Sequence, residues 1–151
     1  MRVFESLAEL RPLVGQEIAV SDWVEVTQQR IDQFAQATGD HQWIHVDPQR
    51  AAKGPFGTTI AHGYLTLSML PLFSETAIEL RGVRMSVNYG LNRVRFMSPV
   101  PVGSELRGRF RLMAIEDIAN GGLQITTEVT VERKGSDRPV CVAESIARRY
   151  A

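Results

Sequence analysis

The first half of the chain carries apolar residues at helical spacing. From residue 27 to residue 38 they recur at positions i, i+3, i+4 and i+7, with polar residues between them. The residues that form this stripe are Ile31, Phe34, Ala35 and Thr38. Thr27 precedes the stripe and is a residue type that caps helix N-termini, whereas Gly39 follows it. The pattern predicts an amphipathic helix that ends near Gly39.

Two more helices are predicted before residue 80. Asp47-Pro48 combines an N-cap residue with proline at the first helical position, which predicts one or two helical turns through Ala52. The stretch from Ile60 to Phe73 is apolar on all sides, so it predicts a helix that the rest of the protein encloses. Between the first two helices, the segment from Asp40 to His45 is predicted to be a tight loop.

After Leu80 the apolar residues alternate with polar ones, which is the spacing of strands. The alternation changes parity near Gly90, and this indicates a long strand with a bulge between Gly90 and Asn92. The predicted strands cover residues 87–96, 106–115, 123–131 and 140–148. This order predicts a single α+β domain over residues 1–151, in which a curved antiparallel sheet wraps around the central apolar helix.

Composition argues against several classes of partner. The chain has 17 basic and 17 acidic residues, so its formal net charge of zero produces no field that attracts nucleic acid or an anionic membrane. The single cysteine, Cys141, excludes an internal disulfide and lies in an apolar run, where a buried inert thiol is expected. The N-terminus lacks the apolar stretch of a signal peptide, so an intracellular, cytoplasmic protein is expected.

Candidate chemistry lies between the first two predicted helices. Asp40 and His45 stand five positions apart in a segment bounded by Gly39 and Pro48. A carboxylate beside an imidazole can hold a water molecule between a proton acceptor and a proton donor, as adding water to a carbon–carbon double bond requires. The alternative is a helix C-cap followed by a turn residue. His41 and His45 could suggest a metal site, but no third histidine or cysteine is placed to close it, so no metal is expected.

The predicted elements and several short motifs resemble the MaoC-like dehydratases, which include the (R)-specific enoyl-CoA hydratases (hydratase 2) and have the hot dog fold. The resemblance covers essentially the whole chain. Its motifs are Ala37-Thr38-Gly39-Asp40, Ile44-His45, Asp47-Pro48, Ala61-His62-Gly63 and Pro99-Val100-Pro101-Val102-Gly103-Ser104. Gln42 and Trp43 depart from the family's Asn-Pro, as in a subgroup that includes nodulation-protein-N-like chains. The substitutions at Gln42 and Trp43 are expected to affect which substrates the protein accepts.

The resemblance implies a reaction and roles for particular residues. The expected reaction is the reversible syn addition of water to trans-2-enoyl-CoA, which gives (3R)-3-hydroxyacyl-CoA. Asp40 and His45 match the catalytic acid/base pair, and Gly63 matches a position whose backbone N–H would stabilise the enolate oxygen. Coenzyme A is part of the substrate, so no separate cofactor is implied. The family forms homodimers by joining two sheets edge to edge, which covers exposed strand edges.

Further residues are candidates for the substrate-binding site. They are Gly39, Gln42, Trp43, His62, Tyr64, Asn88 and Arg93. His62 is expected to be either a buried, hydrogen-bonded histidine near the site or a direct participant in the chemistry. Basic side chains could bind the phosphates of coenzyme A, which suit arginine in particular. The candidates for that contact are Arg84, Arg93, Arg95 and Lys53.

Three other functions are compatible with the same sequence. A 3-hydroxyacyl-ACP dehydratase of fatty-acid synthesis would use the same residues in the reverse direction on a different carrier. A hot dog thioesterase normally relies on a carboxylate on or beside the central helix, and residues 60–73 contain none. A non-catalytic module that binds acyl thioesters is favoured by the departures at Gln42 and Trp43.

Overall fold

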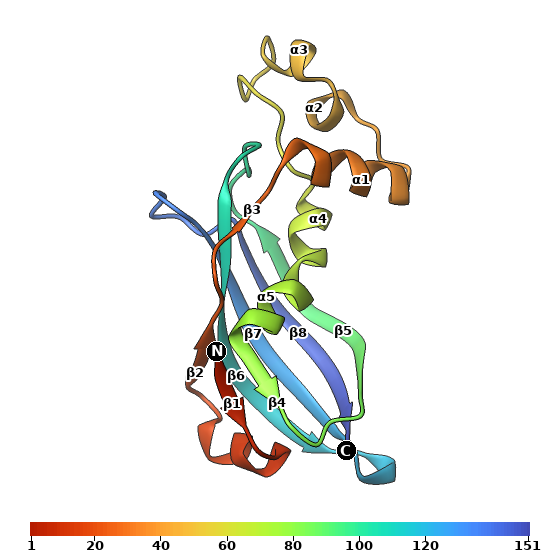
Figure 1. Cartoon of the computed structure of the whole chain (residues 1–151), viewed down its shortest axis with the longest axis vertical. Coiled ribbons are helices and arrows are strands. Elements are labelled where there is room, and N and C mark those ends of the chain that lie inside the picture. The colour runs from red at the N-terminus through yellow and green to blue at the C-terminus, as the bar shows by residue number, and fades with distance from the viewer.

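The computed structural model describes residues 1–151, with helices lying along one face and at one end of a curved antiparallel sheet (Figure 1). The long strands are β5 (Met85–Phe96), β6 (Glu105–Asp117), β7 (Leu123–Arg133) and β8 (Cys141–Tyr150). The short strands are β2 (Glu17–Val20) and β3 (Val24–Glu25). The sheet order is β2-β6-β7-β8-β5, and β3 also pairs with β6. The four predicted strands are confirmed, with ends that differ by no more than a few residues.

The predicted bulge in the first long strand is confirmed. Where β5 pairs with β8, the register shifts between Asn88 and Gly90 and again between Leu91 and Val94. These shifts bend the edge strand away from its neighbour's regular course, as bulges do.

Five α-helices and two 3₁₀ helices complete the chain. They are η1 (Leu7–Leu13), α1 (Gln28–Thr38), α2 (Trp43–Val46), α3 (Pro48–Ala51), α4 (Gly63–Ser68), α5 (Leu70–Ala77) and η2 (Ala119–Gly121). The hydroxyl of Thr27 accepts a hydrogen bond from the Arg30 amide, and Gly39 ends α1 with a φ of 84°. Helix α1 therefore begins and ends where its capping residues predict, and α3 begins after Asp47, whose side chain accepts a hydrogen bond from the Arg50 amide.

The central helix departs from its prediction. Ile60 forms a β-bridge with Pro101, and the Ala61 amide donates to the carbonyl of Val100, so helical structure begins only at Gly63. It is also divided into α4 and α5, with Pro71 in the first turn of α5. The single helix expected over residues 60–73 is therefore wrong. Ile60 and Ala61 form extended backbone pairs instead of helical turns. Pro71 has no N–H to donate a helical hydrogen bond, so the helix is interrupted before it.

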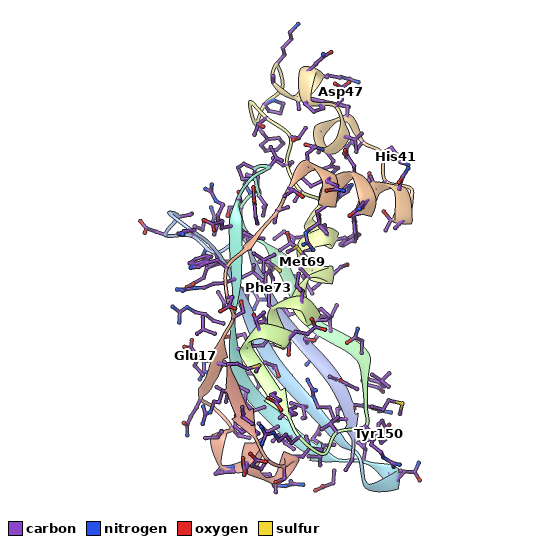
Figure 2. All side chains as sticks on the ribbon, viewed as in Figure 1. Glu17, His41, Asp47, Met69, Phe73 and Tyr150 are labelled. Atoms are coloured by element: carbon purple, nitrogen blue, oxygen red, sulfur yellow. The ribbon has the colours of Figure 1, made fainter.

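Helices α4 and α5 lie against the concave face of the sheet rather than being enclosed on all sides. Met69 and Phe73 are buried between the helix and the sheet, in the middle of the molecule (Figure 2). Gly108 on β6 permits this close approach, since an added Cβ would lie 3.1 Å from the Cβ of Phe73. Tyr64, by contrast, is 70% exposed. The prediction of complete enclosure is wrong, because the sheet covers only one side of the helix.

The N-terminal elements are too short to give a readable period. Strand β1 (Arg2–Phe4) pairs in parallel with β4 (Ile78–Leu80), which directly follows α5. Phe4 and Leu10 join the main hydrophobic core. None of the helices combines the length and apolar character needed to cross a membrane.

Candidate active site

His45 and Asp40 lie in the segment between α1 and α3, at the helical end of the molecule (Figure 1). The segment is not wholly the tight loop that was predicted. Asp40 is exposed in a loop, and its Oδ1 accepts a hydrogen bond of 3.3 Å from the Gln42 amide. Residues from Trp43 onward form the single turn α2, in which the His45 amide donates to the Gln42 carbonyl. This turn rotates His45 inward, so it is buried.

One ring nitrogen of His45 has a fixed role. Nδ1 lies 2.6 Å from the carbonyl oxygen of Ile60. A carbonyl oxygen can only accept a hydrogen bond, so Nδ1 carries the proton. Burial lowers the pKa of His45 below its ordinary value of 6.5, although the Ile60 hydrogen bond opposes this shift. At neutral pH the ring is therefore uncharged, and Nε2 presents a lone pair that can accept a proton.

His62 joins the two predicted catalytic residues. It is buried immediately before α4, and its ring stacks on that of His45 with centroids 3.9 Å apart. Its Nε2–H donates to the backbone carbonyl of Asp40 at 3.0 Å. Its Nδ1 is buried without a hydrogen-bond partner. His62 thus holds the Asp40 loop against the His45 ring.

The three side chains form a group with potential metal ligands. One carboxylate oxygen of Asp40 and one ring nitrogen each of His45 and His62 lie within 4.8 Å of one another. His62 was expected near the site but not as a potential metal ligand, and exposed His41 is not part of the group. A shared ion needs lone pairs that converge at about 2.0–2.1 Å. The rings of His45 and His62 are stacked with their planes 25° apart, so their in-plane lone pairs are nearly parallel rather than convergent.

Gln28 and Thr59 hold the His45 turn in place. The Gln28 Nε2 donates to the carbonyl of His45 at 2.8 Å, and its Oε1 accepts from the hydroxyl of Thr59 at 2.6 Å. Thr59 is only 1% exposed, so this hydrogen bond satisfies a buried hydroxyl. Sequence reasoning missed both residues. Each has an ordinary polar side chain, and no local pattern signals a contact across 31 positions.

Gly63 begins α4 beside this group of residues. The backbone amides of Gly63 and Tyr64 donate no hydrogen bond within the protein, so both remain available. A Cβ at Gly63 would lie 2.9 Å from the ring of Phe96. A glycine lacks a side chain that would keep a ligand from the backbone. The structure adds a different reason, which is that the Phe96 ring occupies the space of a side chain.

The other candidate residues fall into two groups. Gly39, Gln42 and Trp43 lie in the same segment as Asp40 and His45, and Tyr64 lies in the first turn of α4 beside Gly63. Trp43 is covered by the guanidinium of Arg50, 4.4 Å from the ring, and Tyr64 meets Phe96 edge to face. Asn88 and Arg93 lie instead on β5. Asn88 lines a partly open cavity, whereas Arg93 is exposed at the sheet edge.

The basic residues considered for phosphate binding contact different groups. Arg84 donates to the carbonyl of Ala151, and Arg95 donates to the carbonyl of Val94. Lys53 is exposed in the loop after α3.

Comparison with known proteins gives consistent matches. A family model described as the MaoC like domain matches residues 9–134. The chain is 55% identical over 151 residues to 3-hydroxyacyl-thioester dehydratase Z of Mycobacterium tuberculosis, covering 100% of both chains. It is 50% identical over 143 residues to nodulation protein N of Rhizobium leguminosarum bv. viciae, covering 93% of this chain and 89% of that one.

A solved structure supports the fold. The unliganded R-hydratase PhaJ1 from Pseudomonas aeruginosa superimposes with a TM-score of 0.71 at 24% identity, covering 95% of this chain and 84% of that one. This likeness confirms the hot dog fold that the sequence predicts.

Proposed function

Because the chain belongs to the MaoC-like dehydratase family and is therefore a hydro-lyase, we propose that it hydrates trans-2-enoyl-CoA reversibly to (3R)-3-hydroxyacyl-CoA. The observation that carries this proposal is the buried His45, because its Nδ1–H is held by the Ile60 carbonyl and one of its ring nitrogens lies within 4.8 Å of an Asp40 carboxylate oxygen. Such a pair can hold one water molecule and move its proton.

In the hydration direction, His45 Nε2 accepts a proton from water while the oxygen forms its bond to C3. The imidazolium then returns that proton to C2 on the same face, so the net change is one water added syn across the double bond. The Asp40 carboxylate orients the water and favours the charged imidazolium, since its charge raises the pKa of His45. Dehydration follows the same steps in reverse.

Negative charge develops on the thioester oxygen between these two steps. The free amides of Gly63 and Tyr64 are the donors that would stabilise it. Removing one donor of this kind typically lowers the rate by about 100- to 1000-fold. The reaction needs no metal or redox group in this scheme, and coenzyme A serves only as the carrier of the acyl chain.

The proposed assembly is a homodimer joined through β5. This edge strand has twelve residues, nearly all of them exposed, and it presents a row of large apolar side chains. They are Met85, Val87, Tyr89, Leu91 and Phe96. A long apolar edge of this kind is normally covered in a soluble protein.

The test is turnover of crotonyl-CoA, followed by loss of the enoyl absorbance and by the stereochemistry of the product. We expect the wild type to give the (3R) product. Asp40→Asn and His45→Gln should each lower kcat by about 100- to 10,000-fold, since each removes half of the proton-transfer pair. The matched control is His41→Gln, because His41 is an exposed neighbour outside the group.

The result also separates the alternatives. The name of the Mycobacterium tuberculosis relative specifies a thioester and not its carrier, so acyl-carrier-protein thioesters are assayed beside coenzyme A thioesters. A clear preference for the protein carrier would assign the chain to 3-hydroxyacyl-ACP dehydration. Wild-type protein that binds both thioesters and turns over neither would instead be a binding module.

A further inference from the structure

A cavity of about 710 Å³ lies between the α4–α5 helices and the concave face of the sheet. Its volume is within the range of small-molecule binding sites. Most of its wall is apolar, formed on the sheet side by Phe110, Ile125 and Val129 and on the helix side by Leu67 and Leu70. A flexible alkyl chain fits such a surface.

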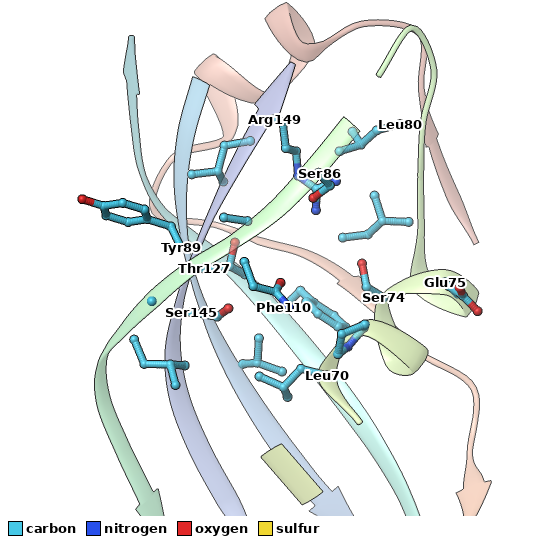
Figure 3. Close-up of a pocket in the computed structure, with 18 of the residues that line it drawn as sticks. Leu70, Ser74, Glu75, Leu80, Ser86, Tyr89, Phe110, Thr127, Ser145 and Arg149 are labelled. Carbon is cyan, nitrogen blue, oxygen red and sulfur yellow. The ribbon is translucent and has the colours of Figure 1, made fainter. Parts of the chain in front are cut away.

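The far end of the cavity is polar and positively charged. Arg149 projects into it from β8, beside Ser86 and near Leu80, whereas Ser145 and Leu70 lie toward the other end (Figure 3). Ser74 also lines this region. The guanidinium of Arg149 and the hydroxyls of Ser74 and Ser86 therefore lie together at one end of a mixed wall.

Arg149 has no partner within the chain. Its guanidinium makes no hydrogen bond and no salt bridge, and burial lowers the pKa of this group. Glu75 also lines the cavity, but it is exposed on α5 and forms no ion pair with Arg149. Arg109, by contrast, is paired with both Glu17 and Glu132. A partly buried guanidinium without an anion in its own chain is free to bind a carboxylate from a ligand.

The cavity begins at Leu67 and extends along the sheet to Arg149. Leu67 of its lining lies one turn along α4 from Gly63. At the same end of the sheet, Cys141 of β8 pairs with Phe96, whose ring contacts Gly63. Eight residues along β8 separate Cys141 from Arg149, a distance of about 26 Å at the usual strand rise. Only a long chain attached to a thioester at Gly63 could reach the guanidinium.

We propose that this cavity binds the acyl chain of a long-chain thioester whose far end is a carboxylate, and that Arg149 pairs with that carboxylate. The inference rests on the proposed function, because it assumes a thioester held at Gly63. The planar guanidinium can bind a carboxylate through two parallel hydrogen bonds, which a methyl-ended chain cannot accept. The chain's own residues therefore select for a charged end as well as for length.

The experiment uses trans-2-enoyl-CoA substrates in a length series from decenoyl to octadecenoyl. Each length is prepared with a methyl end, with a free carboxylate end and with the methyl ester of that carboxylate. The ester is the matched substrate, since it keeps the size and removes the charge. For wild type we expect kcat/KM for the longest carboxylate to exceed that for its ester by about 30-fold, and no such preference at the shortest length.

Arg149→Met should abolish the preference while keeping much of the side-chain volume. The control is Arg148→Met, which changes the neighbouring residue on the opposite face of β8, where Arg148 stacks on Tyr89. It should retain the wild-type ratio of carboxylate to ester. Arg149→Met should melt no lower than wild type, because it removes a cation that has no partner. The ratio of kcat/KM for the carboxylate to kcat/KM for the ester is thus measured on a folded enzyme.

The outcomes are distinguishable. Equal kcat/KM for carboxylate and ester at every length overturns this inference, while turnover of crotonyl-CoA in the same preparation leaves the proposed function in place. Loss of all turnover, crotonyl-CoA included, overturns the proposed function itself.

A free fatty acid shares the carboxylate chemistry and is tested separately. If hexadecanoate inhibits wild type but not Arg149→Met, and no substrate preference is seen, the cavity binds free fatty acid and the inference is wrong.

Discussion

At the scale of single residues, the protonation of His45 depends on its immediate neighbours. Burial and the nearby His62 lower the pKa of His45, whereas the Ile60 hydrogen bond and the charge of Asp40 raise it. Since the uncharged ring is the form that accepts a proton, activity should be lost as the pH falls through the pKa of His45. The acid limb of kcat/KM should therefore lie below pH 6.5, the ordinary value for histidine.

His62 is expected to act as a positioning residue. His62→Phe keeps an aromatic ring against His45 and removes the hydrogen bond to the Asp40 carbonyl. Loss of that bond, worth about 1 kcal/mol, should lower kcat roughly fivefold. Removing the charge interaction with His62 should also raise the pKa of His45, so the acid limb of kcat/KM moves to higher pH. The measurement is the pH–rate profile of the variant.

The pH profile distinguishes this role from a purely structural one. His41→Phe changes an exposed histidine in the same segment and should leave the acid limb where it is. An NMR titration of the three histidine rings would follow His45 directly. An acid limb that stays fixed in His62→Phe, in a variant that melts like wild type, would argue against coupling between the stacked rings.

At the scale of secondary-structure elements, the start of α4 is set by its contact with β5. Gly63 fits beneath the Phe96 ring, and the preceding residues pair with the segment around Val100. This arrangement leaves the first two amides of α4 free at the acid/base site. The position of these donors is thus decided by packing rather than by the local helical preference of the sequence.

Gly63→Ala should destabilise the protein by about 1–3 kcal/mol, because the new methyl group overlaps the Phe96 ring. Removing the ring in a second variant, Phe96→Ala, should relieve most of this overlap. The double variant should therefore be less destabilised than the sum of the two single variants. Urea unfolding of the four proteins measures this coupling. Additive losses would mean that the ring moves aside freely.

At the scale of the whole molecule, the open feature is the β5 edge. The opposite side of the sheet ends in the short strands β2 and β3, whereas β5 is long and apolar. Strand edges of this length invite pairing with a second chain. The dimer proposed above would extend the antiparallel sheet through β5 of both copies.

Val87→Lys should shift the protein from dimer to monomer, since a lysine on the edge strand opposes pairing. The matched control is Val3→Lys on β1, because Val3 is 40% exposed and Val87 is 42% exposed. Sedimentation or light scattering at several concentrations measures the change. A wild-type protein that is monomeric at all concentrations, or a dimer unaffected by Val87→Lys, would contradict assembly through β5.

The sequence by itself determined the elements whose signals are local. Helix α1 follows from its apolar stripe between Thr27 and Gly39, and the long strands follow from alternation interrupted by glycine turns. The five-residue spacing of Asp40 and His45 identified the candidate chemistry. These features depend on neighbouring residues only, because capping, periodicity and turn formation involve groups a few positions apart.

Only the tertiary structure decided how distant residues meet. It stacked His62 on His45, linked Gln28 to Thr59, and broke the expected central helix where Ile60 pairs with Pro101. It also placed the Arg149 side chain in a cavity without a partner from its own chain. The physical reason is the same in each case. These contacts join segments that are far apart in the chain, so their geometry and burial are set by packing of the sheet and helices and leave no periodic trace in the sequence.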